Sequence, residues 1–437
     1  MPEIRPFRAL RFAPDSVGDV ASIVAPPYDV VAAEEQARLL ARHAKNVIRL
    51  DLPSVEPGDE PDDRYRRAAR TLAAWRSDGT LHKDPRASIY AYEQTYVVPG
   101  TEVGRTQRGF FGRLRLEAFG PDSGVLPHER TLEGAREDRY RLLRATGVNT
   151  SPVVALYDDP SGASSAILAT IAAGEAAIDV RDDDGVRHRL WIAEAEGPSA
   201  VLVAGLIAAA AAGPITIADG HHRYETALRY RDERRMARSC EEDPAFDYLL
   251  TLLLETTAEP LTVLPTHRLI RGLGSDGIAG LRDGLYEVFE TRPARRDELE
   301  AAFGNGLAEG GRGRFGLWTR DGGLTLTARR GAFAGSNGSA GRAIQQLDVW
   351  LLGAALERLS GIGPAEVEAG ERIGYTKSLA EAIDGVNAGD ADAAFLLEPT
   401  PVASISAVAR AGEVMPQKST YFYPKALTGL VINPHEW

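Results

Sequence analysis

Hydrophobic and polar positions follow strand and helix periods through residues 1–265 of the chain. Period-two alternation or a continuous apolar run predicts strands over residues 4–12, 47–52, 87–98, 105–116, 151–157, 187–193 and 248–254. One-sided apolar patterns or Ala-rich composition predict helices over residues 32–43, 65–78, 166–173 and 199–212. Because Gly100 separates two of the strand patterns, we expect a hairpin around it.

Glycine becomes abundant between residues 272 and 342, where the pattern indicates a second and smaller α+β unit. Asp321-Gly322-Gly323 joins strand patterns over 314–319 and 324–328, which predicts another hairpin. A helix is predicted over 347–359 and a strand over 393–397. We therefore predict an α+β chain that divides into residues 1–265 and 266–437.

Residues 214–228 are predicted to form a buried strand, a tight turn and the start of a helix. Ile215 and Ile217 alternate as in a strand, Asp219-Gly220 is a turn signal, and residues 225–238 lack Gly and Pro. Unpaired N–H groups and the helix dipole favour an anion at a helix N-terminus, and glycine lets a phosphate approach the backbone. The stretch therefore predicts a phosphate site.

His221, His222 and Arg223 add hydrogen-bond donors directly after this turn. Arg223 can bind phosphate oxygens through two parallel hydrogen bonds, and the histidines can donate hydrogen bonds or move protons near neutral pH. Asp219 can orient or deprotonate a substrate hydroxyl. The alternative is that these side chains only cap the helix and pair with nearby acids. Their concentration in five consecutive positions after an apolar strand favours a site.

Two further polar stretches carry candidate residues. His128, Glu129 and Arg130 precede a charged helix that is predicted to end near residue 144, so they can line the same site or be charges on the helix face. Residues 415–425 place small hydroxyl groups between Lys418 and Lys425, and lysines can neutralise phosphate charge. The alternative for this segment is a buried aromatic end with two surface lysines. Both alternatives remain open from the sequence.

Composition and charge restrict the class of protein. The chain has 437 residues, of which 44% are hydrophobic and 26% charged, as in soluble globular proteins. Its formal charge of −12, with Lys and Arg scattered among acids, argues against nucleic acid as a partner. The longest apolar run, residues 200–212, is too short to cross a bilayer, and the N-terminus lacks an apolar signal core. We therefore expect a cytoplasmic protein that binds neither membranes nor nucleic acid.

Four motifs together resemble a bacterial and archaeal family called domain of unknown function 1015. The motifs are Pro26-Pro27-Tyr28-Asp29, His128-Glu129-Arg130-Thr131, Ala218-Asp219-Gly220-His221-His222-Arg223-Tyr224 and Pro416-Gln417-Lys418-Ser419-Thr420-Tyr421-Phe422-Tyr423-Pro424-Lys425. The resemblance runs from about Ile4 to Ile432. The central motif is also similar to the phosphate-binding segment of the ParB and sulfiredoxin superfamily. Residues 219–223 resemble the Asp-Gly-His-Thr-Arg run of its free-serine kinases, with His222 in place of the threonine.

The resemblance implies a mixed-sheet ParB/sulfiredoxin-like core with large insertions, followed by the smaller C-terminal α+β unit. It also implies that ATP or ADP binds, because members of the superfamily hold nucleotide phosphates at a helix that begins with glycine. Family members are often encoded beside enzymes of the phosphorylated serine pathway, which points to serine or phosphoserine as substrate. Mg²⁺ is expected to accompany the nucleotide phosphates. The oligomeric state is not fixed by the sequence.

We therefore predict a phosphotransferase that moves phosphate between a nucleotide and the hydroxyl of serine or a serine-like molecule, in either direction. The catalytic residues are predicted to be Asp219, His221, Glu129 and Lys418, the phosphate-binding residues Gly220, His221, His222, Arg223, Ser419 and Thr420, and the substrate-binding residues His128, Arg130, Tyr28 and Lys425. One alternative is a nucleotide-binding regulator of the ParB-like type without turnover. Another is a metal hydrolase with His128, His221 and His222 as ligands.

Overall fold

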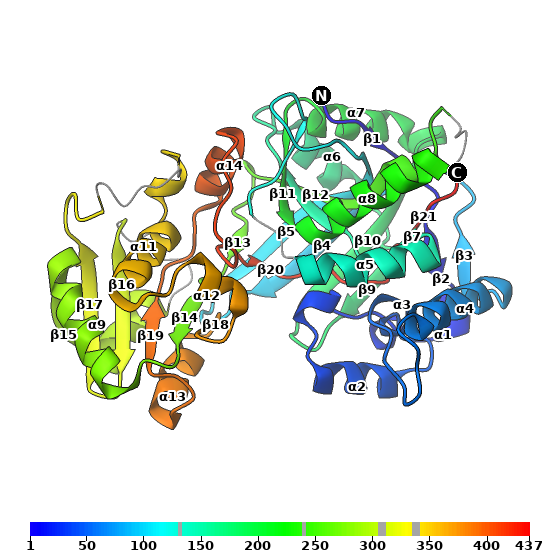
Figure 1. Ribbon diagram of the computed structural model, residues 1–437. Helices are drawn as coiled ribbons and strands as arrows, with labels where there is room; N and C mark the ends of the chain where they lie inside the picture. Colours follow the sequence, from blue (N-terminus) through cyan, green and yellow to red (C-terminus); the bar gives the residue numbers. More distant parts are fainter. Residues whose placement is uncertain (130–132, 238–241, 305–311, 334–340) are drawn as a thin grey trace.

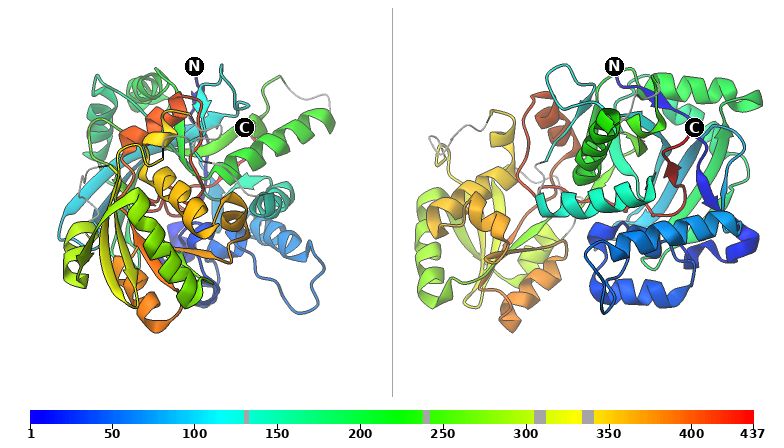
Figure 2. Two further views of the ribbon diagram at one scale, coloured as in Figure 1. Left: turned by 60° about the vertical axis from the view of Figure 1, so that its left-hand side comes forward. Right: turned by 45° about the vertical axis from the view of Figure 1, so that its right-hand side comes forward.

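The computed structural model describes residues 1–129, 133–237, 242–304, 312–333 and 341–437. Figure 1 shows two lobes, each built on its own β-sheet, and the architecture is mixed α+β as the sequence predicts. The first lobe comprises residues 1–255 and 422–437, the second lobe comprises residues 267–396, and two segments connect them. Both chain termini lie on the first lobe, in Figure 1 and in both views of Figure 2. A ParB/sulfiredoxin-like core and a division at residue 265 stay predictions.

The first lobe contains a mixed sheet that has nine strands within the described residues, in the order β6-β11-β8-β12-β5-β4-β10-β9, with β1 beside β5. The strands are β1 Ile4–Arg5, β4 Ser88–Val97, β5 Gly104–Arg115, β6 Val125–Leu126, β8 Val153–Tyr157, β9 Ile178–Arg181, β10 Arg187–Glu194, β11 Ile215–Asp219 and β12 Tyr248–Glu255. Strand β11 is parallel to β6 and antiparallel to β8. The strands predicted over 87–98, 105–116, 151–157, 187–193 and 248–254 are confirmed.

Helices cover one face of this sheet and form a separate N-terminal layer. The helices of the first lobe are α1 Pro14–Val17, α2 Ala33–Arg42, α3 Ile48–Asp51, α4 Asp63–Ser77, α5 Glu133–Thr146, α6 Ala163–Ala172, α7 Ala200–Ala210 and α8 His221–Ala237, with short 3₁₀ helices η1 Val20–Ser22, η2 Tyr28–Val30, η3 Gly197–Ser199 and η4 Ala245–Asp247. Leu143 of α5, Leu206 of α7 and Tyr224 of α8 share one core with the sheet. Full burial of one such aliphatic side chain stabilises the fold by about 1.5–3 kcal/mol. This core fixes the start of α8 against the end of β11.

The second lobe contains an antiparallel sheet in the order β15-β17-β16-β19-β14-β18. Its strands are β14 His267–Ile270, β15 Phe289–Ala294, β16 Arg314–Thr319, β17 Gly322–Ala328, β18 Ile373–Thr376 and β19 Ala393–Leu396. The described helices that follow β14 in the chain are α9 Gly274–Val288, α10 Arg296–Phe303, α11 Asp348–Ser360, α12 Pro364–Ala369, α13 Leu379–Ala388 and α14 Val402–Arg410, with η5 at Ile344–Gln346. The hairpin predicted around residue 322, the helix over 347–359 and the strand over 393–397 are confirmed. None of the described helices has the length and apolar character needed to cross a membrane.

The C-terminal segment returns from the second lobe to the first. Strand β20 Phe422–Tyr423 pairs with β13 Thr262–Val263, and β21 Asn433–Pro434 pairs with β7 Val148–Asn149. The buried Arg113 donates hydrogen bonds to Asn433 Oδ1 at 2.6 Å and to the carbonyl of Pro434 at 2.6 Å. Residues 415–425, which the sequence leaves far from β11, are thereby carried across the end of that strand.

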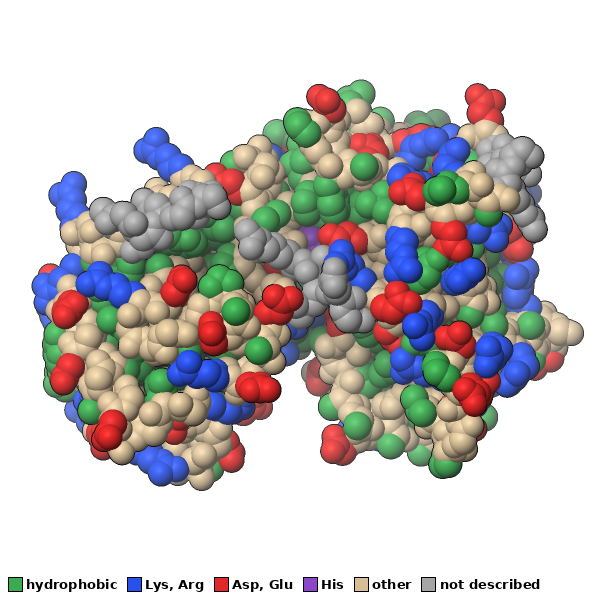
Figure 3. Space-filling model, viewed as in Figure 1, with side chains coloured by type: hydrophobic (Ala, Val, Ile, Leu, Met, Phe, Trp, Pro, Cys, Tyr) green, Lys and Arg blue, Asp and Glu red, His purple; other side chains and the backbone are tan. Residues whose placement is uncertain are grey.

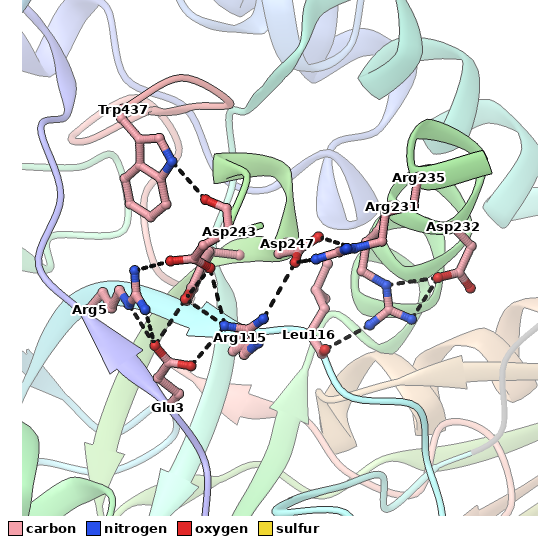
Figure 4. Close-up of polar contacts among 11 residues, drawn as sticks. Glu3, Arg5, Arg115, Leu116, Arg231, Asp232, Arg235, Asp243, Asp247 and Trp437 are labelled. Atoms are coloured by element: carbon pink, nitrogen blue, oxygen red, sulfur yellow. Dashed lines mark hydrogen bonds and ion pairs between the residues drawn. The ribbon is translucent and has the colours of Figure 1, made fainter. Parts of the chain in front are cut away.

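A network of ion pairs holds the two chain ends together. Figure 4 shows Arg5 and Arg115 between Glu3 and Asp243, with Arg115 Nη1 3.0 Å from Glu3 Oε2 and 3.2 Å from Asp243 Oδ1. The indole Nε1 of Trp437 donates to the Asp243 carbonyl at 2.9 Å. These side chains are about one-third exposed, so each ion pair alone contributes little to the stability of the fold. Any larger contribution comes from the several pairs together.

Two predicted strands differ from the structure. The strand predicted over 47–52 is wrong, because residues Ile48–Asp51 form helix α3. The side chain of Asn46 accepts a hydrogen bond from the Ile48 N–H at 2.9 Å, which starts a helical turn where the apolar pattern alone indicates a strand. The strand predicted over 4–12 is divided into β1 and β2 Leu10–Phe12, which pairs with β3 Leu81–Lys83. Pro6 cannot donate to a sheet, so the pairing ends there.

Asn46→Ala is expected to lower the free energy of unfolding by about 2 kcal/mol, since it removes the hydrogen bond from the Ile48 N–H at the start of α3 and two further hydrogen bonds of a buried side chain. Asn46 is fully buried and its Nδ2 donates to the carbonyls of Ser22 at 2.9 Å and Val24 at 3.2 Å. Urea denaturation monitored by circular dichroism measures the loss. A surface change at Glu34 of α2 serves as the control, and an equal midpoint for both variants would contradict the role of Asn46.

Candidate functional site

Strand β11, Gly220 and helix α8 form the turn around which the site is built. Gly220 has φ +88°, and a Cβ at this position would lie 2.9 Å from Arg223 Nε. Glycine is therefore required both by the backbone conformation and by the guanidinium that folds back against it. Helix α8 begins at His221, directly after the turn, so its first N–H groups lack intrahelical partners at the end of β11.

Asp219 lies between two cations. Its Oδ1 accepts a hydrogen bond from Lys425 Nζ at 2.7 Å, and its Oδ2 accepts one from Arg223 Nη2 at 2.7 Å. Burial by itself raises the pKa of Asp219, but the positive charges of Lys425 and Arg223 outweigh it and hold the pKa well below its usual range. The carboxylate therefore stays ionised and is a weak base.

Arg223 is buried behind Asp219. Its Nη1 donates to the Pro152 carbonyl, and its Nε has no partner among the described residues. It borders a cavity of about 40 Å³ that Tyr28, Asp51 and Arg139 also line, and the Arg139 guanidinium carbon lies 3.9 Å from the centre of the Tyr28 ring. In this arrangement Arg223 orients Asp219, and its predicted contact with phosphate stays a prediction.

His128 and His221 meet with their rings edge to face, 4.6 Å between centres. His128 Nδ1 donates to the Ile217 carbonyl, so the neutral ring accepts at Nε2 from the Thr420 hydroxyl at 3.0 Å. The N–H of His128 donates to His221 Nε2 at 3.2 Å. Burial lowers the pKa of His128 to about 4 and the pKa of His221 well below its usual range. Both rings are therefore uncharged at neutral pH and carry hydrogen bonds.

Glu129 and Lys418 come together from opposite ends of the chain. The backbone N–H of Lys418 donates to Glu129 Oε1 at 3.1 Å, and the Met415 N–H donates to the His128 carbonyl at 2.7 Å. Lys418 has φ +56°, which turns the chain there. Burial raises the pKa of Glu129 to about 7, although the Lys418 N–H and charge act in the opposite direction. Glu129 is therefore half ionised near neutral pH.

The remaining predicted residues surround this centre. Ser419 is buried and donates to the Pro416 carbonyl at 2.5 Å, while Lys425 lies beside Tyr421 with Nζ 4.3 Å from the ring centre. Burial lowers the pKa of His222, which begins α8 next to His221. Arg130 lies outside the described residues. The structure thus brings Tyr28, His128, Glu129, Gly220, His221, His222, Arg223, Lys418, Ser419, Thr420 and Lys425 into one region.

Two cations that the sequence analysis did not select also belong to this region. Lys377, which follows β18 of the second lobe, places Nζ 4.0 Å from the centre of the Tyr421 ring. Arg268 of β14 is buried and donates to the Lys418 carbonyl at 3.3 Å. No sequence motif links Thr266-His267-Arg268 to Lys418. The two segments come into contact only in the folded chain.

The three-histidine metal site is not formed. Both ring nitrogens of His128 and Nε2 of His221 are used in hydrogen bonds. Across the described ranges, no group of three or more His, Cys, Asp or Glu side chains is arranged to hold a metal ion. Adjacent residues at the start of a helix point away from each other, which explains why His221 and His222 do not converge.

A family model described as "Protein of unknown function (DUF1015)" matches residues 4–350. The chain therefore belongs to this family, as its motifs indicate. The matched range contains Tyr28, His128, Glu129 and the 219–223 turn, whereas Lys377, Lys418 and Lys425 follow it. A search of curated proteins found no match.

Several solved structures are similar to the chain at low identity. A conserved hypothetical protein from Pyrococcus furiosus is 13% identical, with 68% of this chain and 87% of that chain covered and a TM-score of 0.34. A free serine kinase in complex with AMP is 13% identical, with coverage of 68% and 83% and a TM-score of 0.35. SbnI with a C-terminal truncation, from Staphylococcus aureus, is 10% identical, with coverage of 70% and 83% and a TM-score of 0.36. TM-scores of this size do not transfer an activity to this chain.

Proposed function

We propose that this member of the DUF1015 family is a phosphotransferase that exchanges a phosphoryl group between a nucleotide and the hydroxyl of serine or a serine-like molecule. The observation that carries the proposal is a pair of carboxyl groups with opposite pKa shifts in one site. Neighbouring cations lower the pKa of Asp219, whereas burial raises the pKa of Glu129 to about 7. When the surroundings of two acids separate their pKa values, the acid with the lower pKa stays ionised and the acid with the higher pKa can carry a proton. Here Asp219 would be the fixed anion and Glu129 the proton carrier.

Glu129 is the better candidate for the general base. Its pKa lies near neutral pH. A base with such a pKa is ionised in a large fraction of the molecules and still binds a proton strongly enough to remove it from a hydroxyl. Towards phosphoserine, Glu129 accepts the proton of the serine hydroxyl while that oxygen attacks the γ-phosphorus of ATP and ADP leaves. In reverse, protonated Glu129 gives the proton to the serine oxygen as the phosphoryl group passes to a β-phosphate oxygen of ADP. Asp219 remains ionised and orients the hydroxyl.

The cations and the start of α8 supply the charge that a transferring phosphoryl group requires. Lys418 and Lys425 lie near the N-terminus of α8, where the first backbone N–H groups lack intrahelical partners. Phosphoryl transfer depends on positioning and charge neutralisation more than on covalent chemistry. The choice of serine rests on the similarity of residues 219–223 to the Asp-Gly-His-Thr-Arg run of free-serine kinases.

In this proposal Mg²⁺ would enter the site as a complex with the nucleotide phosphates. One or two protein carboxylates together with substrate phosphates commonly hold Mg²⁺. Asp219 Oδ1 and Oδ2 both accept hydrogen bonds from cations, so the candidate carboxylates for the ion are those of Glu129 and of the exposed Asp29, whose Oδ2 lies 3.8 Å from Arg223 Nη2. Bound Mg²⁺ would neutralise phosphate charge beside Lys418.

The proposal is tested by mixing the full chain with Mg²⁺, ADP and O-phospho-L-serine and measuring ATP and serine, with the reverse reaction in parallel. We expect turnover in both directions, and we expect Lys418→Met to lower kcat by about 10²-fold, as the loss of one charge-stabilising donor does. The Lys418 side chain is exposed, so the variant should unfold at the same urea concentration as the wild type. Lys83→Met, which removes a half-buried lysine that pairs with Glu436 and donates to the Trp437 carbonyl, is the control outside the site.

A nucleotide-binding regulator without turnover is the competing proposal. Binding of ADP by calorimetry with no product in either direction would favour it over the phosphotransferase. Equal rates for Lys418→Met and Lys83→Met would show that the site lies elsewhere.

A further inference from the structure

Lysine is rare in this chain and is concentrated at the site. Only five of the 50 basic residues are lysines, at positions 45, 83, 377, 418 and 425. Three of these five, from segments that are distant in sequence, lie around Tyr421 and Glu129. A lysine ammonium is a compact charge that suits a phosphate oxygen, whereas the arginines used elsewhere form planar pairs.

Tyr421 joins the two lobes at this point. Its ring centre lies 4.0 Å from Lys377 Nζ of the second lobe and 4.3 Å from Lys425 Nζ. Lys425 in turn forms an ion pair with Asp219 at the end of β11. Because Lys377 and Lys425 contact the same tyrosine ring, Lys377 lies close to the start of α8. Figure 3 shows the surface hollowed between the two lobes.

The cations on the second-lobe side lack carboxylate partners. No carboxylate of the described residues lies within ion-pair distance of Lys377, Lys418 or Arg268, although Lys425 has Asp219. The charges of Glu381 and Asp29 act on Lys377 without direct contact, and Glu381 of α13 accepts a hydrogen bond from the Thr376 hydroxyl at 2.6 Å. Burial of its ammonium group and the charges of Lys425 and Lys418 lower the pKa of Lys377. Side-chain cations that have no carboxylate in direct contact favour an anionic ligand.

Arg268 adds a further positive charge next to Lys418. It is buried, and its described hydrogen bonds go to the carbonyls of Thr266 and Lys418, the latter at 3.3 Å. Burial lowers the pKa of Arg268 to about 10. A buried guanidinium with only carbonyl partners raises the positive potential at the Lys418 turn. It is therefore a positioning residue for Lys418.

We propose that Lys377 and Lys418 form a second anion subsite, which binds the phosphate of a nucleoside diphosphate that lies beyond the phosphate held at the start of α8. The inference rests on the proposed function in that the ligand is a nucleotide. It adds that the second lobe contributes to recognition and that a diphosphate is preferred to a monophosphate. Lys377 contacts the distal phosphate from the second lobe, and the Asp219 side of the site contacts the proximal one.

Calorimetric titration of the full chain with ADP, AMP and inorganic pyrophosphate tests the subsite without requiring turnover. We expect Lys377→Met to weaken ADP and pyrophosphate binding by about tenfold or more, the worth of one charge-assisted hydrogen bond, and to leave AMP binding unchanged. The matched control Lys83→Met should bind all three ligands as the wild type does. The Lys377 residue is exposed overall although its ammonium group is partly desolvated, so we expect Lys377→Met to fold, and the urea midpoint checks this.

The outcomes separate this inference from the proposed function. Equal ADP affinity for Lys377→Met and the wild type would overturn the subsite, even if phosphoserine turnover were observed. A parallel loss of AMP and ADP affinity would also overturn it, because Lys377 would then act on the proximal phosphate. Selective loss of pyrophosphate and ADP binding in a protein without turnover would support the subsite and contradict the phosphotransferase.

Discussion

Asp219→Ala is expected to lower the free energy of unfolding by about 3–5 kcal/mol, the usual cost of removing one partner from a buried ion pair. Asp219 accepts hydrogen bonds from both Lys425 and Arg223, at 2.7 Å each. Without the carboxylate, Lys425 and Arg223 lose their shared hydrogen-bonded partner, and the nearest remaining carboxylate is that of Asp29, 3.8 Å from Arg223 Nη2. Urea denaturation at pH 7, with slope and midpoint fitted together, measures the loss. Phosphotransfer should be abolished in the same variant.

Two controls separate charge from packing in this experiment. Asp183→Ala removes an acid of which half the side chain is exposed and which pairs with Arg42 and, at 3.4 Å, with Arg38, so its cost should stay within about 1 kcal/mol. Inorganic phosphate should raise the urea midpoint of Asp219→Ala more than that of the wild type, because an anion can replace the missing charge. Equal losses for the two variants, or no selective effect of phosphate, would contradict a charged role for Asp219.

Glu129→Gln is expected to slow phosphotransfer in both directions by about 10²–10⁴-fold, the typical contribution of a general acid or base. In the wild type the two directions should depend on pH with opposite signs. Phosphorylation of serine needs ionised Glu129, so its rate should fall below the pKa of about 7. Dephosphorylation of phosphoserine needs protonated Glu129, so its rate should fall above that pKa. The variant should lose both dependences.

Stability gives an independent readout of Glu129. Its pKa in the folded chain is raised from 4.5 to about 7, so the folded state holds this proton more tightly than the unfolded state. The resulting stability is fully present below pH 4.5 and is lost as the pH rises through about 7. Glu129→Gln, which still accepts from the Lys418 N–H, should therefore be more stable than the wild type at pH 8. An unchanged or lower urea midpoint at pH 8, with Glu35→Gln as control, would show that Glu129 is not buried as described.

Local patterns in the sequence determined much of the secondary structure and the centre of the site. The alternation of Ile215 and Ile217, the Asp219-Gly220 turn and the absence of helix breakers after it predict β11 and α8, because these features act over a few residues. The hairpins around Gly100 and Gly322 follow for the same reason. Helix α3 shows the limit, since Asn46 is held at its start by hydrogen bonds to the carbonyls of Ser22 and Val24, which a local pattern cannot contain.

Only the tertiary structure decided which charged groups meet and what their charges do. The sequence left open whether Glu129 is a helix-face charge, and it gave no reason to join Lys377 or Arg268 to the 219–223 turn. The return of the C-terminal segment to the first lobe brings Lys418 and Lys425 to Glu129 and Asp219. Burial raises the pKa of Glu129 against the opposing charge of Lys418, 289 residues away, whereas Lys425, 206 residues away, and Arg223 outweigh burial and lower the pKa of Asp219. Because electrostatic energies depend on distance and solvent exposure, they appear only once the chain is folded.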